Sequence, residues 1–455
     1  MRFSDLAGRR VAVWGYGREG KAALAALRRR LPGQRLSLLC SESEAELAAT
    51  LYGDSLECIS VEPYAGLLWT FDVIVKSPGV SAYHAALREA VAAGVVLTSG
   101  TALWFGENPA ARVIAVTGTK GKSTTTALIA HLLRELGRRV ALVGNIGMPL
   151  LELLDTPALV DWWVVELSSF QTGEMGQVDV GLINNIYEEH LDWHGSRDRY
   201  VADKLRLADA SRLLVANGLQ SELVERTAEH PNRHLFGTVA GWHVAEGSVC
   251  WRERRCLDTE SLPIPGEHNA LNLCAALTVL DAIGADSQDA LASVTRFAAL
   301  PHRLQTLGSR DGLRWINDSI STTPQATIEA LRSLDRVPVT VLLGGFDRGV
   351  DWQDFVHFVR QNPPHAVIAM GANGARIAAL LADTATDYLL RRCGSLGEAV
   401  ALARELTPAA GVVLLSPGAP SFDQFKDYAD RGRAFAQLAG FDPQAIVGIQ
   451  GLGVA

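Results

Sequence analysis

The chain has 455 residues, which is too long for one hydrophobic core and predicts two to four domains. Its 48% hydrophobic and 20% charged residues are ordinary for an α/β protein, and a net charge of -8 argues against nucleic acid or an anionic membrane as the main partner. Six cysteines without a C-x-x-C pair, and no apolar run of roughly 18 residues, lead us to expect a cytoplasmic protein with reduced thiols.

The first predicted elements are typical of a nucleotide-binding domain. Residues 10–14 are predicted to form a buried strand, and residues 15–20 then place three glycines in G-x-G-x-x-G spacing before a helix-forming stretch. Such a turn brings backbone N–H groups and a helix N-terminus against a pyrophosphate. The strand predicted at 36–39 ends at Cys40, where an NAD site would carry an acidic residue. The pattern therefore favours a nucleotide diphosphate over a nicotinamide cofactor, with an empty Rossmann-like turn as the alternative.

A further strand at residues 72–76 leads into Ser77-Pro78-Gly79. This turn either approaches the same phosphates or only reverses the chain. Strands and helices alternate up to this point and beyond it, which predicts a Rossmann-like first domain over residues 1–98.

Residues 113–136 carry the strongest chemical signal in the chain. A β-branched run is followed at 118–124 by Gly-Thr-Lys-Gly-Lys-Ser-Thr and then by an alanine- and leucine-rich helix. Backbone N–H groups, the positive helix end and a lysine ammonium converge in such a loop, which suits a polyphosphate, and a hydroxyl of Ser123 or Thr124 can reach Mg²⁺. Val116 replaces the usual upstream glycine, so we predict a variant P-loop. A strand-to-helix turn without a ligand is the alternative.

Polar residues follow the next predicted strands, at the edge where open α/β sheets bind ligands. Glu166 ends the strand at 162–165 and resembles the metal-holding carboxylate of NTPases. His190 follows the strand at 178–183; magnesium prefers oxygen ligands, so a hydrogen-bonded loop histidine is the alternative. Lys204 lies on the helix that follows, and by itself it would be a solvent-exposed lysine.

Two further stretches complete the central domain, which we place at residues 99–302. Residues 232–260 predict strands and turns in a sheet packed beside that domain. The stretch 266–276 opens a helix, with Asn269 and Asn272 on one face, where they either read an adenine or cap the helix.

A third α/β domain is predicted over residues 303–455. Strand–helix alternation restarts after residue 303, with strands at 313–316, 339–343, 366–371 and 411–416 and a helix at 396–406. Three α/β domains with phosphate-type loops in the first two predict two phosphorylated ligands. ATP on the central loop and a nucleotide-linked substrate on the first domain fit this arrangement.

Six ordered motifs across the whole chain resemble the Mur ligases, the ATP-dependent amide-forming enzymes of peptidoglycan precursor synthesis. They lie at residues 118–124, 144–147, 166–171, 268–272, 300–303 and 317–319. The motif at 166–171 and residues 415–425 are similar to those of members that add glutamate to UDP-N-acetylmuramoyl-L-alanine. The resemblance implies a Rossmann-like N-terminal domain, a central P-loop ATPase-like domain and a Rossmann-like C-terminal domain. It also implies a monomer that activates the alanine carboxylate as an acyl phosphate, which the amine of glutamate attacks.

The same resemblance implies the site residues. The catalytic set is Lys122, Glu166, His190 and Lys204, and the Mg²⁺ ligands are Ser123, Glu166, His190 and a carbamylated Lys204. The ATP-binding set is Gly118, Thr119, Lys120, Gly121, Lys122, Ser123, Thr124, Asn269, Asn272, Arg303 and Asp318. The substrate-binding set is Gly15, Gly17, Arg18, Glu19, Ser77, Asn145, Ser168, Gln171, Thr322, Arg348, Ser421 and Tyr428.

Three departures from the common D-glutamate enzymes fall in the expected glutamate pocket. Ile320 and Arg348 each stand where those enzymes carry a lysine, and Tyr428 stands for a phenylalanine. A forked guanidinium aims at a carboxylate differently from an ammonium. We therefore expect L-glutamate as the added amino acid, with D-glutamate as the alternative.

Two other functions fit parts of the pattern. Folylpolyglutamate synthetases share the phosphate-loop motif but lack a preceding glycine-turn domain. A nucleotide-binding regulatory protein without catalysis would not need Glu166, His190 and Lys204 together.

Overall fold

The computed structural model describes the whole chain except residues 157–158, 188–193, 265, 335–336, 383–386 and 447. It divides into two compact units. The first contains Met1–Leu262, His268–Phe297 and Gly451–Ala455, and the second contains Pro263–Glu267 and Ala298–Gln450. Two parallel sheets share the first unit, so the three-domain division at residues 98 and 302 stays a prediction. No helix in the described ranges is long and apolar enough to cross a membrane.

The N-terminal sheet is parallel throughout, in the order β3-β2-β1-β4-β5. Short apolar strands such as β1 are buried because helices cover both faces of a parallel sheet. Its strands are β1 (Val11–Trp14), β2 (Leu36–Leu39), β3 (Leu56–Ile59), β4 (Val73–Lys76) and β5 (Val96–Ser99). Its helices are α1 (Arg18–Arg30), α2 (Glu42–Tyr52), α3 (Ala65–Leu68), α4 (Ala85–Ala92) and α5 (Gly100–Glu107).

The central sheet has the order β11-β10-β9-β6-β8-β7-β21, with β6 in its middle. Its strands are β6 (Val113–Thr117), β7 (Val140–Gly144), β8 (Trp162–Glu166), β9 (Val178–Ile183), β10 (Ser211–Asn217), β11 (Arg233–Phe236) and β21 (Gly453–Val454). Its helices are α6 (Lys122–Glu135), α8 (Arg197–Asp209), α9 (Ser221–Arg226), α10 (Glu267–Ala282) and α11 (Ser287–Leu291).

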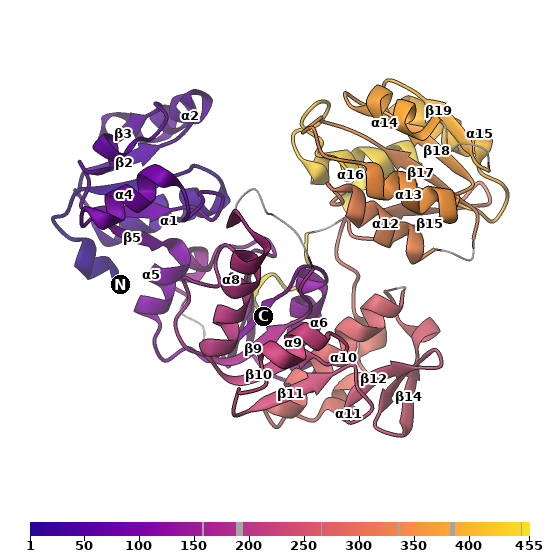
Figure 1. The fold of residues 1–455 in the computed structure, drawn as a ribbon, viewed down its shortest axis with the longest axis horizontal. Coiled ribbons are helices and arrows are strands. Elements are labelled where there is room, and N and C mark those ends of the chain that lie inside the picture. The colour runs from indigo at the N-terminus through magenta and orange to yellow at the C-terminus, as the bar shows by residue number, and fades with distance from the viewer. Residues whose placement is uncertain (157–158, 188–193, 265, 335–336, 383–386, 447) are drawn as a thin grey trace. The chain divides into compact units, whose positions relative to one another are not determined.

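The last strand of the central sheet comes from the far end of the chain. β21 pairs antiparallel with β7, and Arg134 of α6 donates to the backbone oxygens of Gly451 and Val140, each at 2.7 Å. Figure 1 shows the yellow end of the chain among the elements of the central sheet. This return was not predicted from the sequence.

The prediction of a separate sheet over residues 232–260 is correct only in part. β12 (Trp242–Ala245), β13 (Ser248–Trp251) and β14 (Arg254–Asp258) form a three-stranded antiparallel sheet. β11, however, pairs parallel with β10 and extends the central sheet.

The second unit contains one six-stranded sheet in the order β15-β16-β20-β17-β18-β19, antiparallel only at β15. Its strands are β15 (Gln305–Arg310), β16 (Leu313–Asn317), β17 (Val339–Leu343), β18 (Ala366–Ala369), β19 (Leu389–Arg392) and β20 (Val412–Leu415). Its helices are α12 (Pro324–Arg332), α13 (Gln353–Gln361), α14 (Gly374–Leu381), α15 (Leu396–Leu406) and α16 (Tyr428–Leu438). The predicted α/β class with parallel sheets is confirmed.

Candidate active site

The loop between β6 and α6 has the backbone shape of a phosphate cradle. Gly118 and Gly121 have φ angles of +152° and +76°, which favour glycine. A Cβ at Gly121 would lie 2.4 Å from Asn272 Oδ1, and one at Gly118 would lie 2.8 Å from Asn184 Cβ. The loop has no room for larger residues, so its backbone can lie directly against a ligand.

The charged and hydroxyl groups of this loop gather at the start of α6. The helix begins at Lys122, and its first N–H groups have no carbonyl partner within the helix. Lys122 Nζ donates to the backbone oxygens of Gly118 and Thr119, each at 2.9 Å. Ser123 and Thr124 are buried in the first turn. The loop thus combines an ammonium, a helix N-terminus and two hydroxyls, as a polyphosphate site requires.

Helix α8 approaches the same loop. Lys204 Nζ donates to Gly118 O at 2.8 Å, and the hydroxyl of Tyr200, one turn earlier, is 2.6 Å from Thr119 Oγ1. Lys204 is only 2% exposed, so the solvent-exposed lysine expected from its local sequence is wrong. Tyr200 was not predicted; its only signal is its position four residues before Lys204, on the same helix face.

Glu166 is the carboxylate that fits a metal best. It is 1% exposed at the end of β8, and Oε1 accepts from Asn145 Nδ2 at 2.9 Å. Its other oxygen, Oε2, is buried with no hydrogen-bond partner among the described residues. A buried carboxylate oxygen is costly unless paired or bound to a cation, so the residue fits Mg²⁺. His190 lies outside the described residues, and its assignment stays a prediction.

The described residues hold no group of three or more His, Cys, Asp or Glu side chains that would bind a metal alone. A magnesium ion here would therefore need loop hydroxyls and ligand oxygens besides Glu166. That need agrees with how Mg²⁺ is usually held, by one or two carboxylates with water and phosphate oxygens.

The segment after Glu166 and the start of α10 border the phosphate loop. Ser168 Oγ donates to Gln171 Oε1 at 2.9 Å, which closes a turn. Asn272 Nδ2 donates to Asn269 Oδ1 at 3.2 Å, and Asn184 Nδ2 donates to Asn272 Oδ1 at 3.3 Å. The asparagines therefore lie against the loop rather than only capping the helix.

The first glycine turn lies at the carboxyl end of β1. A Cβ at Gly20 would lie 1.9 Å from Gly15 O, so this glycine lets α1 approach the turn closely. Ser77 Oγ donates to Gly15 O at 3.2 Å, so Ser77 supports the turn; Gly17 is exposed at the helix start. Arg18 donates to Gly147 O at 3.1 Å and connects the turn with the loop that carries Asn145.

Glu19, in the first turn of α1, lies near the start of α5. Its Oε2 lies 3.6 Å from the position of a Cβ on Gly100. Burial, and next the nearby carboxylate of Glu174, raise its pKa from 4.5 to about 7, while Arg18 acts in the opposite direction. Glu174 itself forms an ion pair with the buried Lys76. The carboxyl of Glu19 therefore gains or loses its charge near neutral pH.

The residues expected around glutamate and the distal part of ATP lie in the second unit. Asp318 accepts from Ser321 Oγ at 2.5 Å, from Ser416 Oγ at 2.8 Å and from the Leu304 amide at 3.0 Å, and burial raises its pKa to about 6. Ser421 is buried and Arg348 is exposed. Arg303, Thr322, Arg348, Ser421 and Tyr428 all lie at or beyond strand ends of this sheet.

Arg431 of α16 was not predicted from the sequence. It is 1% exposed and donates to Ser319 Oγ at 3.0 Å, Ser319 O at 2.9 Å and Ala419 O at 3.0 Å. Burial lowers its pKa to about 10. This guanidinium fixes the loops that hold Thr322 and Ser421, and only its burial, which sequence does not reveal, marks it out.

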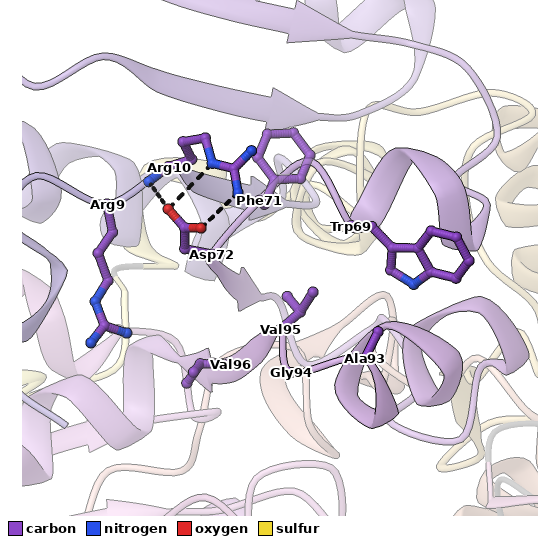
Figure 2. Close-up of a pocket in the computed structure, with 9 residues that line it drawn as sticks. All are labelled: Arg9, Arg10, Trp69, Phe71, Asp72, Ala93, Gly94, Val95 and Val96. Atoms are coloured by element: carbon purple, nitrogen blue, oxygen red, sulfur yellow. Dashed lines mark hydrogen bonds and ion pairs between the residues drawn. The ribbon is translucent and has the colours of Figure 1, made fainter.

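The depression drawn in Figure 2 lies at the other edge of the N-terminal sheet, before the first residues of β1, β4 and β5. It is bounded by Arg9, Trp69 and the pair of Arg10 with Asp72, which bond through side chain and backbone. Ligands of parallel sheets bind at the carboxyl ends of the strands, so this depression is not the active site.

The central part of the chain and its fold both match one class of enzyme. The model of the Mur ligase middle domain matches residues 116–280. The crystal structure of UDP-N-acetylmuramate-alanine ligase MurC from Thermotoga maritima has the same fold, with a TM-score of 0.59 at 20% identity over 94% of this chain and 98% of that one. The structure of MurF ligase from Thermotoga maritima, solved with ADP, gives a TM-score of 0.58 at 16% identity, over 98% of this chain and 96% of that one.

Relatives that align over nearly their full length point to a narrower group within this class of enzyme. The UDP-N-acetylmuramoyl-L-alanine--L-glutamate ligase of Xanthomonas axonopodis pv. citri is 48% identical over 100% of both chains. The enzyme of that name from Salinispora tropica is 39% identical over 96% of this chain and 98% of its own. The chain therefore belongs to the Mur ligase family, whose members are ATP-dependent ligases.

Proposed function

We propose that this protein adds L-glutamate to UDP-N-acetylmuramoyl-L-alanine, with ATP converted to ADP and phosphate, in cytoplasmic peptidoglycan precursor synthesis. The names of the full-length relatives support the substrates and the L-handedness. The observation that carries the reaction type is the convergence of Lys122 and Lys204 on Gly118 O, after β6. The neighbouring strand β8 ends at Glu166, whose Oε2 is buried and has no hydrogen-bond partner among the described residues.

In the proposed reaction, an oxygen of the alanine carboxylate bonds to the γ-phosphorus of ATP as the bond to ADP breaks. The amine of glutamate then attacks the carbonyl carbon, loses a proton and expels phosphate. Lys122 and the first turn of α6 hold and neutralise the phosphates, while Asn145 and the Ser168–Gln171 turn position the muramoyl-alanine end. Such catalysis depends on alignment and charge neutralisation.

The fit of Glu166 supports Mg²⁺ as the cofactor, held by Glu166 with Ser123, and by Lys204 if it is carbamylated. When bound, the ion would neutralise phosphate charge. Lys204 is buried, and its Nζ donates to the loop carbonyl of Gly118. Carbamylation of this lysine is part of the same proposal.

The remaining substrate assignments are part of the same proposal. The glycine turn with Gly15, Gly17, Arg18, Glu19 and Ser77 would receive the UDP. Asn269, Asn272, Arg303 and Asp318 would complete the ATP site, and Ile320, Thr322, Arg348, Ser421 and Tyr428 would set the handedness of glutamate. We also propose that the protein is a monomer and that its thiols are reduced; the six free cysteines support the reduced thiols.

Phosphate release by the purified full-length chain tests the proposal. We expect release only when UDP-N-acetylmuramoyl-L-alanine and L-glutamate are both present with ATP and Mg²⁺. Turnover with D-glutamate as fast as with the L-enantiomer would overturn the handedness, and release that needs neither substrate would overturn the ligase reaction. A dihydrofolate-type acceptor serves as the control for the folylpolyglutamate alternative.

A further inference from the structure

A chain of hydrogen bonds next to the candidate active site links four side chains that the proposed reaction does not use. Ser169 Oγ lies 3.0 Å from His194 Nε2, and His194 Nδ1 lies 2.7 Å from Asp203 Oδ2. The hydroxyl of Tyr83 donates to both oxygens of Asp203, at 3.0 and 2.9 Å. We call Tyr83, Asp203, His194 and Ser169 the relay.

Three of the relay residues are buried, Tyr83 is half-buried, and the histidine is held between two aromatic rings. His194 is 0% exposed, Ser169 5% and Asp203 7%. The ring of Phe170 stacks on the imidazole at a centroid distance of 5.6 Å, and the ring of Tyr200 meets its edge at 5.1 Å. Carboxylate oxygens only accept, so Nδ1 donates to Asp203, while Nε2 faces the Ser169 hydroxyl.

The order serine, histidine, aspartate is that of a nucleophilic triad. A nucleophile must meet a reacting carbonyl, whereas Ser169 is buried. The arrangement therefore lacks access to a substrate, and its effect must pass through the residues it holds.

The relay joins two segments that both carry site residues. Asp203 directly precedes Lys204 on α8, the helix whose Tyr200 and Lys204 contact the phosphate loop. Ser169 lies between Ser168 and Gln171, in the segment that follows Glu166. Tyr83 belongs to the loop before α4, so its hydroxyl anchors this connection in the N-terminal sheet region of the same unit.

We propose that the relay is a positioning device for the active site. It fixes the rotation of α8 and the position of the segment 167–171. It thereby holds Lys204 and Glu166 in fixed positions relative to the phosphate loop. Tyr83, Asp203, His194 and Ser169 are then positioning residues rather than catalytic ones. The kinetic part of this inference rests on the proposed ligase function.

Single substitutions in the full-length chain test the kinetic part. Tyr83→Phe removes one hydroxyl and keeps the ring, and Asp203→Asn removes the charge that orients His194. We expect each to lower kcat about 10- to 100-fold, as loss of a partner that orients a ligand does, with KM for ATP unchanged. Asp209→Asn, at an exposed residue of the same helix, is the matched control and should leave kcat unchanged.

A double variant separates positioning from general loosening. Because both residues act through one connection, Tyr83→Phe added to Asp203→Asn should lower kcat no further. Independent, multiplicative losses would contradict a single device. If activity falls in proportion to the melting temperature in all variants, the proposal of a positioning device is also overturned.

Amide hydrogen exchange provides a readout that does not depend on turnover. In Tyr83→Phe and Asp203→Asn we expect faster exchange in residues 167–171 and in α8, with unchanged exchange in β9, while Asp209→Asn exchanges like the wild type. If the wild type shows no ligase activity, the proposed function fails but this comparison still decides the inference. Unchanged exchange in both segments refutes the relay as a positioning device.

Discussion

Replacing Glu19 by glutamine should change how the stability of the first unit depends on pH. The folded pKa of this carboxyl is about 7 instead of 4.5, chiefly because of burial. A raised folded pKa means that the folded state holds its proton more tightly than the unfolded state. The contribution of Glu19 to the free energy of unfolding is thus fully present below pH 4.5 and is lost as the pH rises through 7. At about 1.4 kcal/mol per pKa unit, the whole change is about 3 kcal/mol.

Glutamine has no such proton, so Glu19→Gln should gain stability relative to the wild type as the pH rises. Urea unfolding at pH 5 and pH 8, with amide exchange in β1 and α1 as the probe, reads the first unit separately from the second. Most of the 3 kcal/mol should appear between these two pH values. Glu46→Gln, at an exposed position on α2, is the control. A constant difference between Glu19→Gln and the wild type across this range would refute the reasoning.

Three further substitutions test separate parts of the site. Lys122→Ala should lower kcat about 1000-fold while the melting temperature holds, because it removes a donor at the transferring phosphate; near-normal turnover would remove Lys122 from the mechanism. Glu166→Gln should raise the Mg²⁺ concentration for half-maximal phosphate release about tenfold or more, and an unchanged magnesium titration would contradict the metal assignment. Arg431→Lys should destabilise the second unit by about 2 kcal/mol in urea unfolding, because one ammonium cannot replace the three hydrogen bonds of the guanidinium. Equal urea midpoints for the variant and the wild type would contradict that role.

The fold was predictable wherever the signal is local. Buried parallel strands are continuous apolar runs, and the phosphate loop combines glycine positions with a helix start, so both are visible in the sequence. The helix expected at 396–406 coincides with α15. β21 was not predictable, because two residues carry no periodicity and are held by partners more than 300 positions away in sequence.

The candidate site was predictable only by motif. Lys204 shows the limit: its neighbours Asp203 and Arg206 are charged, which indicates a solvated helix face. The structure instead turns Lys204 to the loop and Asp203 to His194. Such burial depends on packing between elements, which a single sequence does not encode locally.

The return of β21 to the central sheet has a mechanical consequence. The chain leaves the first unit after Phe297 and rejoins it at Gly451, so the second unit is tethered at both ends. Residues 298–450 are therefore an insertion whose two ends are both held by the first unit, and not a domain attached at the end of the chain. Pairing of Gly453–Val454 with β7 fixes the second of these ends, and its loss would leave the C-terminal end of the insertion without that attachment.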